Sequence, residues 1–289
     1  MIKKSLLFLA LALSFAVLSL TGCNRGNSSS VGASSRTSSG VTYKMASEDD
    51  FEVRLASDMT VIIHKYIGEG GYITIPATIQ GVQVTMIGAH AFYLHYGVTG
   101  VQLPEGIRSI GESAFESSAI ITINIPSSVT SIGNNAFRMA FALESISIPD
   151  SVTTFGYNLF TNSGLKSFTF PEGMVKEKTI KFREWADGTG MFEGSRLEKI
   201  VIPEGIESIG SFAFKNCTSL TSVTLPSTIK TINPSAFRDC SSLTEVIIPE
   251  SVVRINFPTF YGPDDCFIGA NLNIASQAAL RQRGWSGRM

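Results

Sequence analysis

The sequence predicts a repeat solenoid, mainly β, in which short parallel strands stack coil upon coil. A proline preceded by an aliphatic or aromatic residue returns mostly every 22–23 residues, and in six of eight units a phenylalanine follows it 11 residues later. Apolar and polar residues alternate before each proline. Such self-similarity is typical of stacked repeats, because one unit can bury its apolar face only against its neighbours.

Each landmark has a physical role. Proline has no N–H group and cannot continue a central ladder, so it closes the strand that precedes it. The phenylalanine is expected to fill the core between coils. The prolines are Pro76, Pro104, Pro126, Pro149, Pro171, Pro203, Pro226 and Pro249, and the phenylalanines are Phe92, Phe115, Phe137, Phe160, Phe192, Phe214, Phe237 and Phe260.

A glycine or an asparagine stands four residues before each phenylalanine. Because asparagine is the residue that best replaces glycine where φ is positive, the pattern predicts a left-handed backbone at this position. The residues are Gly88, Gly111, Gly133, Gly156, Gly188, Gly210, Asn233 and Asn256.

The N-terminal residues are typical of an exported protein. Lys3 and Lys4 precede an uninterrupted apolar run over 5–20, and "LTGC" ending at Cys23 resembles a bacterial lipobox. The resemblance implies a signal peptide over 1–22 and a lipid on Cys23. The alternative is an uncleaved membrane anchor, for which sixteen residues are short of the roughly 20 that a span needs.

Residues 23–42 are expected to form a flexible tether rich in Ser and Gly. Its seventeen residues from Asn24 to Gly40 have a root-mean-square reach of roughly 23 Å.

Composition argues against several classes of function. The 23 Lys and Arg are balanced by 24 Asp and Glu, for a net charge of −1, so no basic face for nucleic acid is expected. The histidines His64, His90 and His95 have no metal-ligand spacing. We therefore predict no enzyme, no catalytic residue, no metal and no cofactor.

The repeat pattern L-x-x-[VI]-x-[IL]-P-x-x-[VI]-x-x-I-G-x-x-A-F resembles the BspA-type leucine-rich repeat of bacterial surface proteins, over about residues 43–289. The resemblance implies a right-handed coil of parallel strands with repeats over 76–262. It also implies an N-terminal cap over 43–75, with a hairpin of about 51–55 and 59–66. The C-terminal cap over 263–289 would hold a short helix N-capped by Ser276, with Arg281 and Arg283 in its last turn and Gly284 ending it.

Two cysteines, Cys217 and Cys240, each lie three residues after the phenylalanine of their unit, where other units have Ser or Ala. They should therefore lie one above the other. One alternative is a buried ladder of small residues, and the other is a disulfide, which an exported protein permits.

Departures from the period mark candidate binding residues. The fifth unit carries an insertion over 174–190, and insertions in repeat proteins often lie on the binding face. Aromatic and basic residues gather there and, as a second cluster, after Phe92; the alternative is a tolerated insertion whose tryptophan packs back on its coil. The candidates are Lys176, Lys178, Lys181, Phe182, Arg183 and Trp185, and then Tyr93 and Tyr96.

These observations lead us to expect a lipid-anchored protein of the bacterial cell envelope, at the outer membrane or cell surface. The family resemblance implies adhesin-like binding of host or bacterial surface proteins or glycans, which is an argument by analogy. A periplasm-facing envelope scaffold is the alternative, and a glycan-acting enzyme is a remote one.

Overall fold

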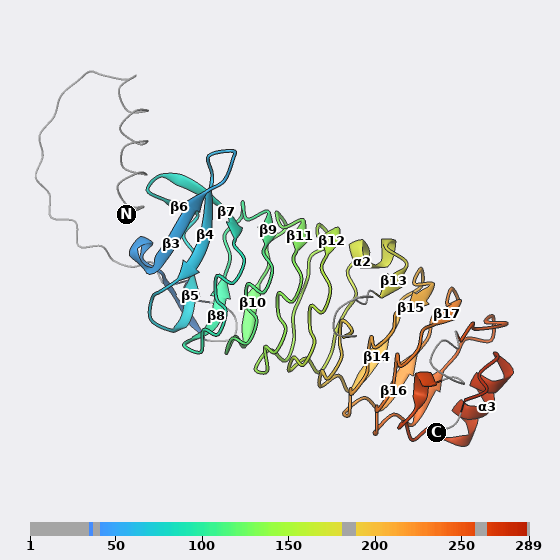
Figure 1. The fold of residues 1–289 in the computed structure, drawn as a ribbon. Coiled ribbons are helices and arrows are strands. Elements are labelled where there is room, and N and C mark those ends of the chain that lie inside the picture. Colours follow the sequence, from blue (N-terminus) through green and yellow to red (C-terminus); the bar gives the residue numbers. More distant parts are fainter. Residues whose placement is uncertain (1–34, 37–40, 181–188, 258–264, 288–289) are drawn as a thin grey trace, which may run out of the picture.

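The computed structural model describes residues 35–36, 41–180, 189–257 and 265–287. It is an elongated stack of coils with a strand-rich cap at one end and a helix at the other (Figure 1). We number the coils 1 to 8 by the phenylalanine that each contributes to the core. The predicted β-solenoid of parallel strands is confirmed.

Two series of parallel strands run along the stack. The first contains β2-β5-β8-β10 and, after a gap, β14-β16-β18; β1 pairs antiparallel with β2. The second contains β4-β7-β9-β11-β12 and then β13-β15-β17. The strands of the first series are β1 (Ser35–Arg36), β2 (Thr42–Met45), β5 (Gly71–Thr74), β8 (Val98–Gln102), β10 (Thr122–Asn124), β14 (Lys199–Val201), β16 (Ser222–Thr224) and β18 (Glu245–Ile247). Those of the second are β4 (Val61–Tyr66), β7 (Val82–Ile87), β9 (Ser109–Ile110), β11 (Ser131–Ile132), β12 (Thr154–Phe155), β13 (Thr179–Ile180), β15 (Ser208–Ile209) and β17 (Thr231–Ile232).

The predicted N-terminal hairpin is present as β3 (Phe51–Leu55) and β4, which pair antiparallel. It continues the solenoid, because β4 pairs in parallel with β7. The second strand begins at Val61 and not at 59, since Met59 lies in the turn with a φ of 64°. The remaining short elements are η2 (Glu48–Asp50), β6 (Thr78–Ile79), α2 (Glu172–Lys176), η3 (Asp265–Phe267) and α3 (Ile274–Gln282).

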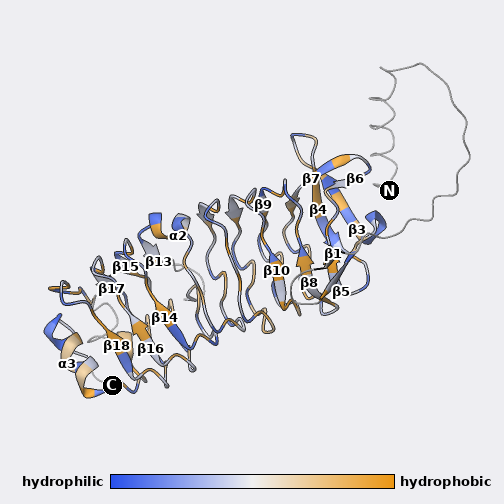
Figure 2. Cartoon of the chain, turned by 180° about the vertical axis from the view of Figure 1, so that it is seen from behind, coloured by the Kyte–Doolittle hydropathy of each residue, from blue (hydrophilic) through white to orange (hydrophobic). Residues whose placement is uncertain are grey.

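A column of stacked phenylalanine rings forms the centre of the core. Eight rings lie 4.9–5.8 Å apart with interplanar angles of 1–15°. Tyr66 stacks on one end of the column, and Trp285 meets the other end edge-on. Figure 2 shows how hydrophobic and hydrophilic residues alternate along the coils, so that one side of each strand can pack on this column. The rings are Phe92, Phe115, Phe137, Phe160, Phe192, Phe214, Phe237 and Phe267.

The last ring of the column differs from the prediction. Phe267 stacks on Phe237 at 5.2 Å, and the Phe237 N–H donates to the Cys266 carbonyl, as Phe214 does to Ala236. The repeats therefore extend into the segment predicted as C-terminal cap. Phe260, which was predicted for this place, lies outside the described residues.

The predicted positive φ at the repeat glycines is wrong. Among the described glycines of this position, neither Gly111 nor Gly133 nor their equivalents Gly88, Gly156 and Gly210 has a positive φ. A Cβ on Gly111 would lie 2.6 Å from the Ala89 nitrogen, and one on Gly133 would lie 2.6 Å from the Glu112 nitrogen. Gly111 and Gly133 are required because the backbone of the preceding coil passes too close for a side chain. The left-handed residues instead lie two positions before and after most of the phenylalanines, such as Ser113 and Ser117 around Phe115.

The C-terminal helix also begins differently. Asn273 is the N-cap of α3, and its side chain accepts the Ser276 N–H at 2.8 Å. Ser276 lies inside the helix, and its hydroxyl accepts the N–H of Val246 in β18. The helix thus covers the free edge of the last strand, which would otherwise invite pairing with another chain. Arg281 lies in the last turn, Arg283 is the C-cap, and Gly284 follows with a φ of 105°.

Candidate binding surfaces

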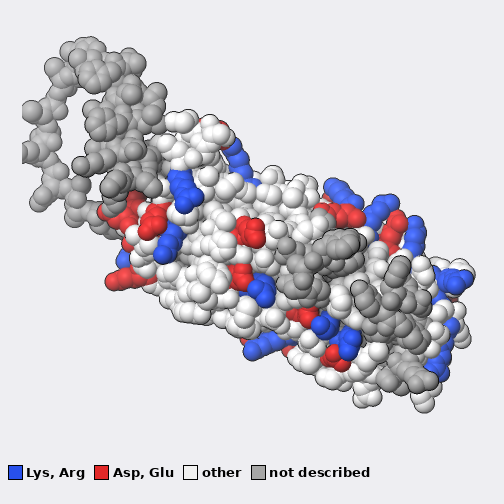
Figure 3. Space-filling view, in the orientation of Figure 1, with Lys and Arg blue, Asp and Glu red and all other residues white. Residues whose placement is uncertain are grey.

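Charged side chains gather along one edge of the solenoid, over α2, β13, β15 and β17, while the middle of the same face carries few (Figure 3). We call this group the charged edge; its residues are Glu172, Lys176, Lys178, Glu207 and Lys230. The residues come from three successive coils, where each coil leaves its proline turn and enters the second series of strands.

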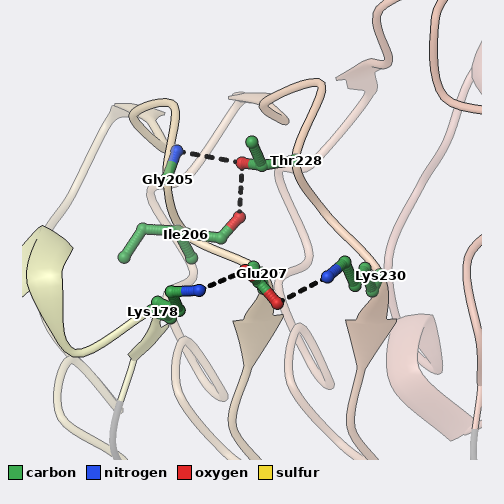
Figure 4. Close-up of polar contacts among 6 residues, drawn as sticks. All are labelled: Lys178, Gly205, Ile206, Glu207, Thr228 and Lys230. Atoms are coloured by element: carbon green, nitrogen blue, oxygen red, sulfur yellow. Dashed lines mark hydrogen bonds and ion pairs between the residues drawn. The ribbon is translucent and has the colours of Figure 1, made fainter.

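Glu207 holds two lysines at once (Figure 4). The Lys178 Nζ lies 2.9 Å from Oε1, and the Lys230 Nζ lies 2.7 Å from Oε2. Hydrogen bonds from Lys230 and then Lys178 are the main reason why the pKa of Glu207 is lowered to about 2. The carboxylate is therefore ionised at every physiological pH and keeps two exposed ammonium groups on either side of it.

A hydroxyl clamp fixes the turn behind these charges. Thr228 accepts the Gly205 N–H at 3.0 Å and donates to the Ile206 carbonyl at 2.8 Å, joining two coils (Figure 4). Ser128 makes the same pair of bonds to Gly106 and Ile107. The side chains of the charged edge therefore project from a backbone that neighbouring coils hold in place.

The structure describes only part of the predicted insertion site. Lys176 lies in the last turn of α2 and pairs with Glu172 at 3.5 Å, and Lys178 belongs to the Glu207 group. Lys181, Phe182, Arg183 and Trp185 lie outside the described residues. Sequence reasoning missed Glu207 and Lys230, although both stand four residues after the proline of their unit, and that shared position is a usable signal.

The second predicted cluster is an exposed apolar surface. Tyr93 and Tyr96 are 44% and 69% exposed, and Leu94 between them is 45% exposed. Two further large apolar side chains on the following coils, Ile121 and Phe141, are 45% and 52% exposed. We call these five residues the apolar ridge. Sequence reasoning missed Ile121 and Phe141 because both look like core residues in a single unit.

The outward strand positions form a face rich in hydroxyl groups in the middle of the stack. Ser145, Ser147, Ser167 and Thr169 are exposed in the middle of the stack. On the second series of strands, a shallow depression of roughly 400 Å³ runs over Gly111, Gly133 and Gly156, where the missing side chains leave backbone uncovered. Within the described residues, no group of His, Cys, Asp or Glu could hold a metal ion.

Cys217 and Cys240 are buried free thiols, so the structure has the ladder and not the disulfide. Each sulfur contacts a carbonyl of the preceding coil, Phe192 O at 3.1 Å and Phe214 O at 3.0 Å. Burial raises the pKa of Cys217 to about 12 and raises that of Cys240 as well. Such thiols are poor nucleophiles, since the thiolate is the reactive form.

Comparison with known proteins agrees with this architecture. The family described as "BspA type Leucine rich repeat region" matches residues 71–184 and 188–279, with six copies. Among the curated proteins, none matches the chain. In the part of the chain that the structure describes, no helix is long and apolar enough to cross a membrane.

Several solved structures are similar to the chain. The leucine-rich repeat protein of T. pallidum is 26% identical, over 85% of this chain and 98% of that one, with a TM-score of 0.56. A leucine-rich repeat protein from Bacteroides ovatus is 22% identical over 78% and 80%, with a TM-score of 0.38. A leucine-rich cell surface protein from Faecalibacterium prausnitzii is 18% identical over 76% and 96%, with a TM-score of 0.30.

Proposed function

We propose that this chain, which belongs to the BspA-type leucine-rich repeat family, is a lipid-anchored binding protein of the bacterial cell envelope. Repeat proteins of this kind use long exposed surfaces to bind partners, and leucine-rich repeats generally bind proteins. The proposed role is adhesin-like binding of a protein on a host or bacterial surface.

The charged edge is the observation that carries the binding role. Two lysines fixed on one carboxylate, with Lys176 beside them, form a preordered donor surface next to the predicted insertion. Groups that are already held in place lose less freedom on binding. Because the three lysines outnumber Glu172 and Glu207, the edge suits a partner with acidic side chains.

The anchor part of the proposal rests on the sequence from Lys3 to Cys23. Mass spectrometry of the N-terminal peptide of the mature protein tests it: the expected peptide begins at Cys23 and carries acyl chains. A peptide that begins at Met1 would overturn it.

Protease shaving of intact cells, followed by detection of the 41–289 domain, tests the location. Loss of the domain, while a periplasmic control protein stays intact, supports surface display. If the domain survives until the envelope is broken, the adhesin role is wrong and the periplasm-facing scaffold becomes the better account.

Site-specific photo-crosslinking tests the binding surface. A crosslinking residue at position 176 should capture one partner protein on cells, and Lys178→Ala with Lys230→Ala should reduce that capture. The matched control is Lys166→Ala, since Lys166 is also an exposed lysine in an ion pair, with Glu144 at 2.7 Å. Equal capture by both variants would overturn a role for the charged edge.

A further inference from the structure

Equivalent positions in the other coils show whether folding requires the apolar residues of the ridge. Four coils carry one extra residue at the tip of the turn, four positions after the phenylalanine. In coils 6 and 7 this tip residue is polar, Thr218 or Ser241, but in coils 1 and 3 it is Tyr96 or Phe141. Ala119 of coil 2 lies between the two rings in stacking order, and its N–H donates to the His95 carbonyl. The tip therefore tolerates polar residues, and folding alone does not require aromatic ones there.

Leu94 and Ile121 also stand at positions where later coils have polar residues. Leu94 has a φ of 55°, a conformation that is strained for a leucine, whereas coils 6 and 7 place Asn216 and Asp239 at the equivalent position. Ile121 stands where coils 6 and 7 have Thr221 and Thr244. Both side chains are 45% exposed, so neither backbone preference nor burial accounts for them.

Two charged side chains beside the ridge neutralise each other in an ion pair. Glu116 of coil 2 and Arg138 of coil 3 pair with each other at 2.7 Å and are largely covered. The equivalent ridge on the later coils carries Lys215, Arg196 and Arg238. At this edge of the solenoid, the exposed large apolar residues are thus concentrated on the first three coils, and Ile268 of coil 8 is the exception among the described residues.

The same end of the solenoid receives the tether. β2, which follows the tether, pairs with β5, and the Gly71 N–H at the start of β5 donates to the Gly97 carbonyl beside Tyr96 at 2.7 Å. Ser35, which pairs with Tyr43 of β2, stands twelve positions after Cys23. A chain of that length reaches roughly 19 Å. The tether and the ridge therefore belong to the same end of the solenoid.

We propose that the apolar ridge rests on the lipid bilayer that holds Cys23, with Tyr93 and Tyr96 at the headgroup level and Leu94, Ile121 and Phe141 against the acyl chains. This inference rests on the lipid attachment of the proposed function. Tyrosine suits the interface because its ring is apolar and its hydroxyl stays wet. The tether supplies an effective concentration in the millimolar range, so weak affinity is enough. The charged edge, on later coils, would then lie beyond the membrane-contacting end.

Vesicle partitioning tests the contact without the anchor. The mature chain, residues 23–289 with Cys23→Ser, keeps every described residue and carries no lipid. We expect it to float with phosphatidylcholine vesicles equally at low and high salt, because the contact is apolar. Tyr96→Thr with Phe141→Ser, which copies the tips of coils 6 and 7, should lower the partition coefficient about tenfold. Val201→Thr with Ile247→Ser removes two exposed apolar side chains elsewhere and should leave it unchanged.

Three outcomes would overturn the proposal. The chain could fail to float, or the ridge and control variants could partition alike. The ridge variant could also keep its partitioning and instead lose a protein crosslinked at position 93, which would make the ridge a protein-docking surface. The mass of the N-terminal peptide tests the anchor separately. If the peptide is lipidated but the ridge does not bind vesicles, only the membrane contact of the ridge is wrong. If the peptide carries no lipid, the anchor itself is wrong.

Discussion

The ring of Phe168 lies 5.3 Å from that of Phe160, at an angle of 52°, beside the column of stacked rings and not within it. It also lies 5.0 Å from Phe192 in the next coil. The other coils have valine or isoleucine at this strand position: Ile73, Val101, Ile123, Ile146, Ile200, Val223 and Val246. A larger ring here must separate the coils that it touches.

The first series of strands is interrupted where this ring packs. In the described structure, no ladder pairs 145–147 with β10 or 167–169 with β14. The phenylalanine rings of coils 2 to 5 lie 5.6–5.8 Å apart, whereas those of coils 5 to 7 lie 5.2–5.3 Å apart. We therefore expect the amides of 145–147 and 167–169 to exchange hydrogen faster than those of 222–224. Phe168→Ile should slow that exchange. Uniform protection along the series would contradict this account.

Removal of one ring from the column should be costly. Phe137 is fully buried between two rings, so Phe137→Ala is expected to lower the free energy of unfolding by about 3–5 kcal/mol. Phe141→Ala, the same change four residues later at an exposed site, should stay within about 0.5 kcal/mol. Urea unfolding of both variants checks the contrast, and equal losses would mean that the column is not the main source of stability.

The glycine at 133 should be required for space. Gly133→Ala is expected to lower the free energy of unfolding by about 1–3 kcal/mol, because the new methyl group meets the Glu112 backbone. Ser131→Ala, on the adjoining strand, is the control and should change little. A neutral Gly133→Ala would show that neighbouring coils separate easily at this point.

The buried thiols should report global unfolding. In the Cys23→Ser protein, Cys217, Cys240 and Cys266 are expected to resist iodoacetamide in the folded state, since all three are buried and the pKa of Cys217 is raised to about 12. Labelling followed by mass spectrometry should show modification only as urea unfolds the chain. Rapid labelling in buffer would require local opening of the coil that carries the labelled cysteine, which is coil 6, 7 or 8.

Acid should weaken the N-terminal end through His95. The Val98 N–H donates to its Nδ1 at 3.1 Å, the ring packs on Tyr66, and burial is the main cause that lowers the pKa of His95. Because the folded-state pKa lies below the unfolded value of about 6.5, the unfolded chain binds more protons as the pH falls. Stability is therefore full above about pH 6.5 and declines as the pH falls through the lowered pKa.

Urea unfolding at about pH 8 and about pH 5 measures this effect, and His95→Gln should remove part of the pH dependence. Glu207, with a pKa of about 2, is ionised at both values and adds no change in that range. An identical pH dependence in the protein and the variant would contradict the role of His95.

The sequence by itself determined the repeat period, the order of strand, proline turn and phenylalanine, the hairpin cap and the small residues beside the column. These features can be predicted because, within one coil, the side chain of each residue faces either the core or solvent, and this alternation recurs along the sequence. The period favoured Phe260, which follows Pro249 by the usual 11 residues, whereas Phe267 fills the column. The last unit places its ring seven residues later than the period predicts, and only the stacking of coils revealed this.

Distances between coils were decided only by the tertiary structure. Gly111 and Gly133 are glycines because of backbone in the preceding coil, and Ser276 serves β18 and not its own helix. Tyr96 and Phe141 share one edge, and Glu207 meets Lys178 and Lys230, since stacking brings together residues that are tens of positions apart. A repeat pattern specifies what each coil presents, whereas the packing of successive coils determines which of those groups become neighbours.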